Sequence, residues 1–284
     1  MLFKKVTVVG LGLIGGSLAW ALKQSGKVEE VSGVDIEEKT LRYAIRQGIV
    51  DNGSRSIQES IEGSQIVVIA THVGLIPMIA KAIIGCSAPE TILTDVGSVK
   101  SSLIEEIESF IPPEYSFVGG HPISGTEHSG ITFSNPNLFN SKRCILTPTS
   151  KTSLSALNKV KSLWEAIGAT VLTMDPETHD RVFAFVSHLP HAVAYTLINT
   201  VASEREPENI LSFAGGGLKD FTRISESSPE MWSEILIANR KHLLDSIQAF
   251  KEEIERLHLA IENNDLQALM EQLRRAAGVK KSLD

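Results

Sequence analysis

The sequence has few features of a secreted, membrane-bound or nucleic-acid-binding protein. Its 284 residues include only two cysteines, Cys86 and Cys144, which are too few for a disulfide framework and favour a reducing compartment. The longest apolar stretch beyond the first segment, 66–86, is interrupted by a histidine, a proline and a lysine, which argues against a membrane span. The formal net charge of -7 argues against a general nucleic-acid binder. We therefore expect a cytoplasmic protein with a small-molecule partner, no nucleic acid and no membrane.

The first apolar segment has two alternative interpretations. Two lysines precede it and it carries no charge over residues 6–22, as in a secretory signal peptide. However, VTVV at 6–9 is typical of a buried strand, and Gly10, Gly12 and Gly15 then form G-x-G-x-x-G in front of a helix. A signal peptide has no need of glycines at fixed spacing. We therefore favour the phosphate-binding turn of a dinucleotide-binding fold.

The glycine motif and a later acidic residue indicate how this fold holds a cofactor. The first glycine makes a tight turn, the second admits the pyrophosphate and the third lets helix and strand pack closely. The start of the helix offers amide donors and a positive dipole to the phosphates. Asp35 lies twenty residues after Gly15, where an acceptor meets the ribose hydroxyls, and no arginine follows it for a 2′-phosphate. We therefore predict NAD rather than NADP, held by Gly10, Gly12, Leu13, Ile14, Gly15, Asp35, Ala70 and Thr71.

Strand-like and helix-like segments alternate along the first part of the chain. After the glycine motif, the pattern predicts helices near 37–47, 75–84 and 99–110, and strands at 65–71 and 91–96. Three more candidate strands, SFVGGHP, RCILTPT and ATVLTMD, end near residue 175. This alternation is typical of a parallel sheet with helices on both faces. We predict an α/β Rossmann-type parallel-sheet domain that binds NAD over residues 1–175.

From residue 176 onward the pattern changes to helix-length segments with apolar residues three and four positions apart. The segments are 177–203, 208–216, 229–261 and 264–276. We predict an all-α domain over residues 176–284, whose extended apolar faces favour a homodimer. The alternative is a helical cap that packs only on its own sheet domain.

Polar residues directly after the predicted strands are the first candidates for chemistry, since ligands of open α/β sheets bind beyond the carboxyl ends of the strands. Thr71, Asp95, Ser98 and His121 are so placed. Two glycines and a proline around His121 predict a rigid turn, and its imidazole can accept a hydroxyl proton while hydride leaves the same carbon. Ser98 either caps the next helix or orients His121 by a hydrogen bond.

Two stretches of the helical part add candidates for substrate binding. His188 and His191 lie three residues apart on one helical face, and one of them is a candidate hydrogen-bond donor to substrate. The pair lacks a third ligand at helical spacing, so we predict no metal. Three consecutive glycines at 215–217 predict a turn or a close approach to a ligand. Arg223 after them offers a planar fork for a carboxylate.

The sequence resembles the prephenate and arogenate dehydrogenase family of tyrosine biosynthesis. The residues that carry the resemblance are VGLGLIGGSLA, DVGSVK, VGGHPISGTEHSG, the HD of ETHDRVFAFVSHLPHAVA, and GGGLKDFTRI followed by MW. They cover nearly the whole chain in order. The resemblance implies a Rossmann domain, a helical dimerisation domain, and oxidative decarboxylation of prephenate to 4-hydroxyphenylpyruvate with NAD.

The resemblance also implies roles for individual residues. His121 would be the catalytic residue, hydrogen-bonded to the ring hydroxyl of the substrate, and Ser98 would orient it. His191 would contact the substrate, and Arg223 would bind a substrate carboxylate. Further expected substrate-site residues, with the tryptophan closing the site from the partner subunit, are Glu127, Asp180, Asp220, Gly217 and Trp232.

One departure from the family pattern and several rival functions stay open. Many relatives have Thr or Ser, Pro, Val after the strand 65–71, whereas this chain has Thr71-His72-Val73, so we expect a different loop beside the nicotinamide. No chorismate mutase or regulatory domain is recognisable, and any feedback by tyrosine is expected at the active site. The rivals are an arogenate dehydrogenase, a β-hydroxyacid dehydrogenase with Lys219 as its catalytic lysine, and a non-catalytic NAD-binding regulator.

Overall fold

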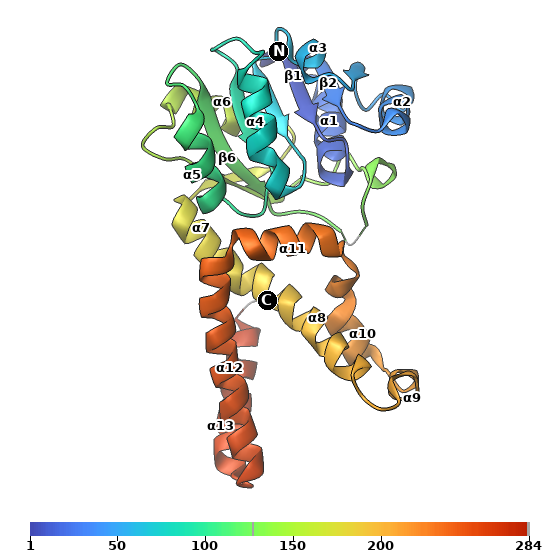
Figure 1. Ribbon diagram of the computed structural model, residues 1–284, viewed down its shortest axis with the longest axis vertical. Helices are drawn as coiled ribbons and strands as arrows, with labels where there is room; N and C mark the ends of the chain where they lie inside the picture. The colour runs from blue at the N-terminus through green and yellow to red at the C-terminus, as the bar shows by residue number, and fades with distance from the viewer. Residues whose placement is uncertain (127, 283–284) are drawn as a thin grey trace. The chain divides into compact units, whose positions relative to one another are not determined.

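Figure 1 shows the computed structural model of the protein, which describes residues 1–126 and 128–282. By its internal contacts the chain divides into two units, Met1–Asn239 and Arg240–Asp284. The first unit contains the sheet and the helices up to α11, and the second contains the two remaining helices. The predicted domain boundary after residue 175 lies within the first unit, between the last strand and α7, and stays a prediction.

Eight strands form one sheet in the order β3-β2-β1-β4-β5-β6-β7-β8. The strands β1 to β6 all run parallel to one another, and the order reverses between β1 and β4, as in a Rossmann fold. The predicted α/β Rossmann-type fold is therefore confirmed. The strands are β1 (Phe3–Val9), β2 (Val28–Val34), β3 (Asn52–Ser54), β4 (Ile66–Ile69), β5 (Ile92–Asp95), β6 (Ser116–Pro122), β7 (Arg143–Thr147) and β8 (Thr170–Thr173).

Two strands depart from the predicted parallel arrangement. β7 pairs antiparallel with β6, and β8 then pairs parallel with β7. A parallel return needs a long crossover, usually through a helix. In the segment that joins β6 to β7, the described residues form no helix longer than the short 3-10 turn η2 (Ile131–Phe133), and the chain comes back in the opposite direction.

Helices cover both faces of the sheet because the strands alternate their apolar side chains between two cores. The first core joins Val6 and Val8 to α1 (Leu13–Ser25), α2 (Glu38–Arg46) and α6 (Leu154–Glu165). The second core joins Val67 and Ile69 to α3 (Ile57–Ile61), α4 (Ile76–Ile84) and α5 (Ser101–Phe110). The predicted helices near 37–47, 75–84 and 99–110 are confirmed, whereas β3, α3 and α6 were not predicted.

The all-α part of the first unit begins directly after β8. Its first predicted helix, 177–203, is one continuous helical segment with a π-helical turn in its middle. The predicted segment 229–261 is divided at Asn239. The elements are α7 (Pro176–Phe183), η3 (Ala184–His188), α8 (Leu189–Ala202), α9 (Pro207–Ser212), α10 (Gly216–Thr222), η4 (Arg223–Glu226) and α11 (Pro229–Ala238).

The second unit consists of α12 (Arg240–Glu262) and α13 (Leu266–Lys281). The two helices pack side by side, and the guanidinium of Arg275 lies 2.7 Å from a carboxylate oxygen of Glu253. Asp265 caps α13 by accepting a hydrogen bond from the amide of Ala268. The predicted helical segment 264–276 is thus confirmed.

The glycine motif allows a direct test of the local fold. A Cβ added at Gly15 would lie 1.9 Å from the carbonyl oxygen of Gly10, whereas a Cβ at Gly12 would meet no atom within 4 Å. Gly15→Ala should therefore lower the free energy of unfolding by about 3 kcal/mol, because the backbone must shift to relieve the clash. Gly12→Ala is the matched control and should cost about 1 kcal/mol or less. Urea unfolding of the cofactor-free variants measures both values, and equal losses would contradict the close packing.

Candidate functional site

The predicted cofactor residues gather where β1, β2 and β4 end. Gly10 has a φ of +93°, and a Cβ there would lie 2.6 Å from the carbonyl oxygen of Ala70, so only glycine fits this turn. Gly12 is the N-cap residue of α1 and has no side chain to satisfy the first helical amides. Space is open beside it. These amides can therefore donate hydrogen bonds to the phosphates of a dinucleotide.

Asp35 is held beside the glycine turn by backbone hydrogen bonds. Its two carboxylate oxygens accept from the amides of Leu11 and Glu37, each at 2.9 Å. The next residue, Ile36, is 79% exposed. The carboxylate therefore has a fixed place at the end of β2, which fits the hydroxyls of a cofactor ribose.

The other predicted cofactor residues lie at the same edge of the sheet. Leu13 is buried and Ile14 is half-buried in the first turn of α1. Ala70 and Thr71 are half-buried directly after β4, where the amide of Ala70 donates to the carbonyl oxygen of Val9 at 2.7 Å. The residues present thus fit NAD.

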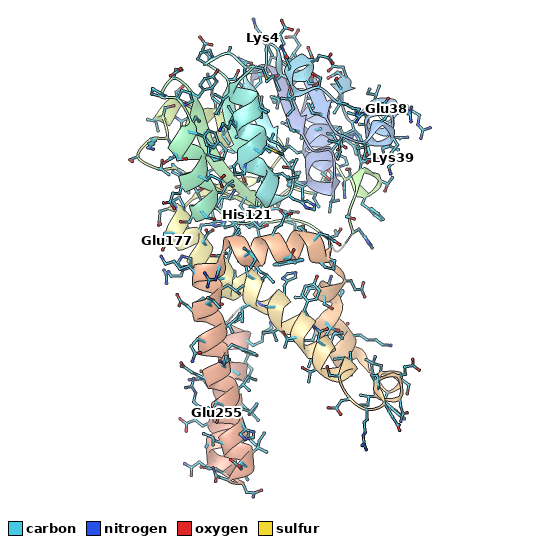
Figure 2. All side chains as sticks on the ribbon, in the orientation of Figure 1. Lys4, Glu38, Lys39, His121, Glu177 and Glu255 are labelled. Carbon is cyan, nitrogen blue, oxygen red and sulfur yellow. The ribbon has the colours of Figure 1, made fainter. Side chains whose placement is uncertain are left out.

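His121 is the next-to-last residue of β6 and lies at the edge of the sheet that faces α11, as Figure 2 shows. The predicted rigid turn around it is wrong, because its two preceding glycines are strand residues paired with β7. A Cβ at Gly119 would lie 2.4 Å from the hydroxyl oxygen of Thr147, and one at Gly120 would lie 2.7 Å from the carbonyl oxygen of Asp95. Close approach of neighbouring chain segments, rather than a turn, accounts for this glycine pair.

A buried ion pair supports the strand that carries His121. Lys100 and Asp95 are both fully buried and form a salt bridge, and the Lys100 ammonium also donates to the carbonyl oxygen of Gly120 at 3.0 Å. The Asp95 carboxylate accepts from the amides of Gly97 and Gly120 at 2.7 Å and 3.0 Å. Asp95 therefore joins the end of β5 to β6 and has structural partners for both of its oxygens.

Three side chains form a hydrogen-bonded row that ends at a helix N-terminus. His121 Nδ1 lies 2.9 Å from His179 Nε2, and His179 Nδ1 lies 2.8 Å from an oxygen of Asp180. The Asp180 carboxylate also accepts from the amides of Lys100 and Ser101 at 2.8 Å and 2.7 Å. Asp180 is thus brought close to the predicted catalytic histidine, through His179.

Burial sets the protonation of this histidine group. It holds the pKa of His121 well below its usual value, and the neighbouring His179 and Lys100 act in the same direction. Burial also lowers the pKa of His179, although the Asp180 carboxylate opposes the shift. His121 is therefore neutral near pH 7 and able to accept a proton.

The structure shows neither of the two hydrogen bonds that were considered for Ser98 among the described residues. Helix α5 begins at Ser101 with Lys100 as its N-cap, so Ser98 does not cap it. Among the described residues, the hydrogen bond of the His121 ring is made with His179, and no bond joins it to Ser98. Ser98 is half-buried after β5, and its catalytic role stays a prediction.

His191 and Trp232 form a stacked pair. Their ring centroids lie 3.5 Å apart with an angle of 21° between the planes. Trp232 is 6% exposed and packs within its own chain, because α11 lies against η1 (Val73–Leu75) and the second core of the same sheet. The expected closure of the partner's site by Trp232 stays a prediction.

The ring orientation of His191 decides which hydrogen bonds it can make. Its Nδ1 lies 2.8 Å from the carbonyl oxygen of Ser187, which only accepts, so Nδ1 carries the proton. Burial lowers the pKa of His191, and the neutral ring then has an accepting Nε2. The histidine proposed from sequence as a donor is thus set up as an acceptor.

His188 belongs to the structural core of the helical part. It is fully buried, and its Nδ1 lies 2.9 Å from the side-chain nitrogen Nδ2 of Asn239. The same Asn239 nitrogen donates to the carbonyl oxygen of Asp180 at 2.8 Å. Asn239 therefore holds α7, η3 and the end of α11 together.

The glycine triplet opens a helix, and the predicted turn there is wrong. Gly215 is the N-cap of α10, and Gly216 and Gly217 are its first residues. Asp220 is exposed on α10, and Arg223 begins η4 with an exposed side chain. Both η4 and α10 pack against α8, the helix that carries His191.

Three further findings concern predicted or excluded sites. Glu127, predicted to bind substrate, lies outside the described residues. Across residues 1–126 and 128–282, no group of three His, Cys, Asp or Glu side chains is arranged to hold a metal ion. Within the same residues, every helix is too short or too polar to cross a membrane.

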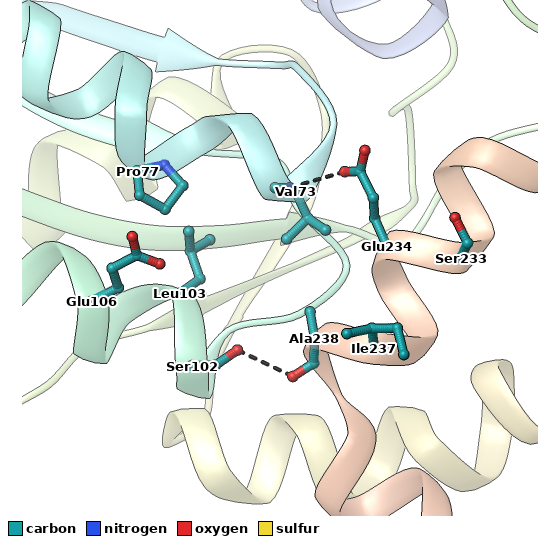
Figure 3. A pocket seen from close by; sticks show the side chains of 10 residues that line it. Val73, Pro77, Ser102, Leu103, Glu106, Ser233, Glu234, Ile237 and Ala238 are labelled. Atoms are coloured by element: carbon teal, nitrogen blue, oxygen red, sulfur yellow. Dashed lines mark hydrogen bonds between the residues drawn. The ribbon is translucent and has the colours of Figure 1, made fainter.

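A pocket of about 460 Å³ lies where α11 meets η1, α4 and α5 (Figure 3). A carboxylate oxygen of Glu234 accepts from the amide of Gly74 at 3.0 Å, and the Ser102 hydroxyl donates to the carbonyl oxygen of Ala238. Neither His121 nor His191 lines this pocket. It therefore belongs to the packing of α11 on the sheet and not to the histidine group.

Sequence reasoning missed His179, Lys100 and Asn239 as parts of the site. His179 stands in the quoted HD pair, but adjacency to Asp180 does not show that its ring contacts a strand 58 positions earlier. Lys100 lies in the quoted DVGSVK, yet its complete burial depends on the fold around it.

Comparisons with known proteins agree on one family. A family profile described as the nucleotide-binding domain of prephenate dehydrogenase matches residues 18–173, and one described as its dimerization domain matches residues 175–275. A prephenate dehydrogenase of Bacillus subtilis is 34% identical over 98% of this chain and 76% of its own length. A cyclohexadienyl dehydrogenase of Zymomonas mobilis is 31% identical over 99% of this chain and 96% of its own length.

Solved structures give the same result. Prephenate dehydrogenase from Aquifex aeolicus, in complex with hydroxyphenyl propionate and NAD+, superposes with a TM-score of 0.93 at 37% identity, covering 99% of this chain and 98% of that chain. Arogenate dehydrogenase from Synechocystis superposes with a TM-score of 0.84 at 30% identity, covering 99% of this chain and 100% of that chain.

The burial of His188 predicts how stability depends on pH. Desolvation lowers the pKa of His188 to about 4 from an ordinary value near 6.5. Between these values the unfolded chain binds a proton that the folded chain does not, so stability falls as pH falls. From about pH 7 to about pH 5 this one group should remove about 2 kcal/mol.

Urea unfolding at the two pH values measures this loss, with His188→Gln for comparison. Glutamine keeps an acceptor for Asn239 but does not titrate. The variant should therefore lose less stability than the original protein over the same pH interval. An unchanged loss would show that other groups cause the pH dependence.

Proposed function

Because this chain belongs to the prephenate dehydrogenase family, we propose that it converts prephenate to 4-hydroxyphenylpyruvate by NAD-dependent oxidative decarboxylation, a step of tyrosine biosynthesis. The observation that carries the proposal is a neutral, hydrogen-bonded His121 at the sheet edge where the glycine turn and Asp35 also lie. A base near the nicotinamide site is what a dehydrogenase of a hydroxyl substrate needs.

Oxidative decarboxylation of prephenate requires little from the protein beyond orientation of the substrate and one general base. The ring hydroxyl loses its proton to His121 as the carbinol carbon loses hydride, which leaves a ketone conjugated with the diene. Bound NAD+ supplies the acceptor for that hydride. The ring carboxylate then leaves as carbon dioxide, and its bonding electron pair enters the ring, so that the ketone oxygen becomes a phenolate oxygen. This oxygen takes back the proton held by His121, which gives the phenol and restores the neutral base. Aromatisation makes the overall reaction effectively irreversible, so orientation and charge recognition are the remaining tasks.

The other predicted residues take their proposed roles around His121. Arg223 binds a substrate carboxylate through its guanidinium fork. His191, stacked on Trp232, presents its Nε2 to a hydroxyl or other donor of the substrate. The helix that carries His191 is joined to the segment after Arg223, because the hydroxyl of Tyr195 donates to the carbonyl oxygen of Ser227 at 2.7 Å. Ser98, Glu127, Asp180, Asp220 and Gly217 remain proposed supporting residues.

An arogenate dehydrogenase is the second candidate. The solved Synechocystis relative is named an arogenate dehydrogenase and the Zymomonas relative a cyclohexadienyl dehydrogenase, at 30% and 31% identity. Arogenate differs from prephenate by an amino group in place of the side-chain ketone. The accepting Nε2 of His191 suits a donor such as this amino group, which is the observation that favours the alternative.

Two more distant functions have less support. A β-hydroxyacid dehydrogenase would need a catalytic lysine, and Lys219 is exposed on α10. A non-catalytic NAD-binding regulator would need no neutral imidazole beside the cofactor site. We also propose a cytoplasmic location, which the two free thiols of Cys86 and Cys144 support.

The test of the function is the formation of NADH from NAD with prephenate and, separately, with arogenate. His121→Asn should lower kcat with the preferred substrate by about 10³-fold or more, because general-base catalysis is lost. The Kd for NAD should change little, since His121 is not among the cofactor residues. Turnover with arogenate alone would identify the protein as an arogenate dehydrogenase. An undiminished kcat in His121→Asn would favour the β-hydroxyacid dehydrogenase that uses Lys219. NAD binding without turnover of either substrate would favour the regulator.

We further propose a homodimer in which the helical part forms the interface. Large apolar side chains are exposed in the first unit at Phe213, 84% exposed, and in the second unit along α12 and α13. Residues 175–275 match a profile whose printed name is a dimerization domain. Apolar surface of this kind is typical of a subunit interface.

Light scattering coupled to gel filtration tests the assembly. The measured mass should be about twice the chain mass of 30.9 kDa at micromolar concentration. Ile254→Lys places a charge on the exposed apolar side of α12 and should shift the protein toward monomer. Glu255→Lys is the matched control on the neighbouring exposed position. A monomer in the unmodified protein would contradict the proposal.

A further inference from the structure

The hydrogen-bonded row behind His121 contains two side chains that the reaction itself does not require. We propose that His179 and Asp180 are positioning residues that hold His121 in one tautomer, with the proton on Nδ1 and the lone pair on Nε2. The inference rests on the proposed function, in which His121 is the base. From the helix N-terminus outward, each member of the row determines whether the next one donates or accepts its hydrogen bond.

The row begins with two backbone amides that can only donate. The amides of Lys100 and Ser101 stand at the start of α5, where helical amides lack intrahelical partners. Both point at the Asp180 carboxylate, whose oxygens therefore act as acceptors. The positive end of the helix dipole also attracts the carboxylate. The remaining contact of this carboxylate is His179 Nδ1 at 2.8 Å, which must therefore carry a proton.

The tautomer of His179 then determines that of His121. The His179 side chain is fully buried, and burial lowers its pKa, so the ring is neutral. A neutral ring with its proton on Nδ1 has a lone pair on Nε2. His121 Nδ1 lies 2.9 Å from His179 Nε2 and must therefore donate a hydrogen bond to this lone pair. His121 Nε2 is left as the acceptor that a substrate hydroxyl needs.

Packing holds the two rings in this geometry. The ring of Phe183 lies 4.8 Å from the His121 ring and 4.5 Å from the His179 ring, measured between centroids. His179 and Phe183 both belong to α7, whereas His121 belongs to β6. The relation between base and helix is therefore set by a shared apolar contact as well as by the hydrogen bond.

The other titratable groups around His121 disfavour its protonated state. The Lys100 ammonium, paired with Asp95, and the His188 ring both lower the pKa of His121, after burial and His179. Cys144 on the adjacent strand β7 stays a neutral thiol, because burial raises its pKa. When His121 Nε2 takes the substrate proton, Nδ1 keeps its bond to His179. The base therefore works without rotating its ring.

Asp180→Asn is the sharpest variant, because it reverses every donor in the row. Asp180 Oδ1 faces both the Lys100 amide and His179 Nδ1, whereas Oδ2 accepts from the Ser101 amide. With its oxygen at the Oδ2 place, the asparagine still accepts from the Ser101 amide, and its NH2 group donates to His179 Nδ1. His179 then carries its proton on Nε2 and donates to His121 Nδ1, which pushes the His121 proton to Nε2. We expect kcat to fall by about 10³-fold with KM for substrate and NAD within about threefold.

Replacement of His179 tests the acceptor itself. His179→Gln retains a carbonyl oxygen that can accept from His121 Nδ1, whereas His179→Leu fills similar space without an acceptor. The leucine variant should lose about 10²-fold in kcat, and the glutamine variant should recover most of that loss. A merely structural role for His179 would give equal losses in both variants, which would overturn the proposal.

The tautomer is read directly from imidazole nitrogen–proton correlation spectra of the NAD-bound full chain with labelled histidine. We expect an Nδ1-protonated His121 in the original protein and an Nε2-protonated His121 in Asp180→Asn. Asp175→Asn is the matched control, since Asp175 caps the same helix by accepting from the amide of Thr178 at 2.9 Å and lies outside the row. It should leave both the spectrum and kcat unchanged.

The two proposals fail in distinguishable ways. If the original protein turns over neither prephenate nor arogenate, the proposed function fails, and the tautomer spectrum still reports on the row. If the original protein is active but Asp180→Asn keeps its kcat and its His121 tautomer, the positioning role fails and the function stands. An Nε2-protonated His121 in the original, active protein would likewise overturn the positioning role.

Discussion

The carboxylate of Asp180 is the interaction on which the arrangement of the site depends. It satisfies the first amides of α5, a helix of the sheet, and accepts from His179 on α7, a helix of the all-α part. An isolated buried carboxylate is costly, so its three N–H partners must be in place together. A single side chain thereby helps to set the position of α7 relative to β6. Through His179, it also sets the position of the His121 ring.

The sheet brings the cofactor residues and the base to one edge for a simple reason. Strands β1, β2, β4, β5 and β6 are parallel, so residues that follow them in the sequence meet at the same edge. Gly10 and Asp35 define the cofactor end of this edge, and His121 lies at the other end, on β6. The buried pair Lys100–Asp95 keeps β5 and β6 in register between them.

The sequence was informative where a local constraint has only one solution. The φ of +93° at Gly10 and the lack of space at Gly15 require glycine, so the spacing predicted the turn correctly. It was misleading where two local structures share a pattern. Glycines can open a helix, as at 215–217, or line a strand, as before His121, and neither case is a turn. The reversal of β7 likewise has no local signal, because strand direction depends on the path of the preceding loop.

The sequence by itself determined the fold class, the dinucleotide turn and the identity of the candidate base, because strand periodicity, glycine spacing and residue chemistry are local properties. Only the tertiary structure decided the partners of that base. His121 and His179 are 58 positions apart, and Asp180 and Lys100 are 80 apart, so their hydrogen bonds exist only after α7 has packed against α5. The stacking of Trp232 on His191 and the accepting Nε2 of His191 arise in the same way, since ring orientation depends on neighbours brought together by folding.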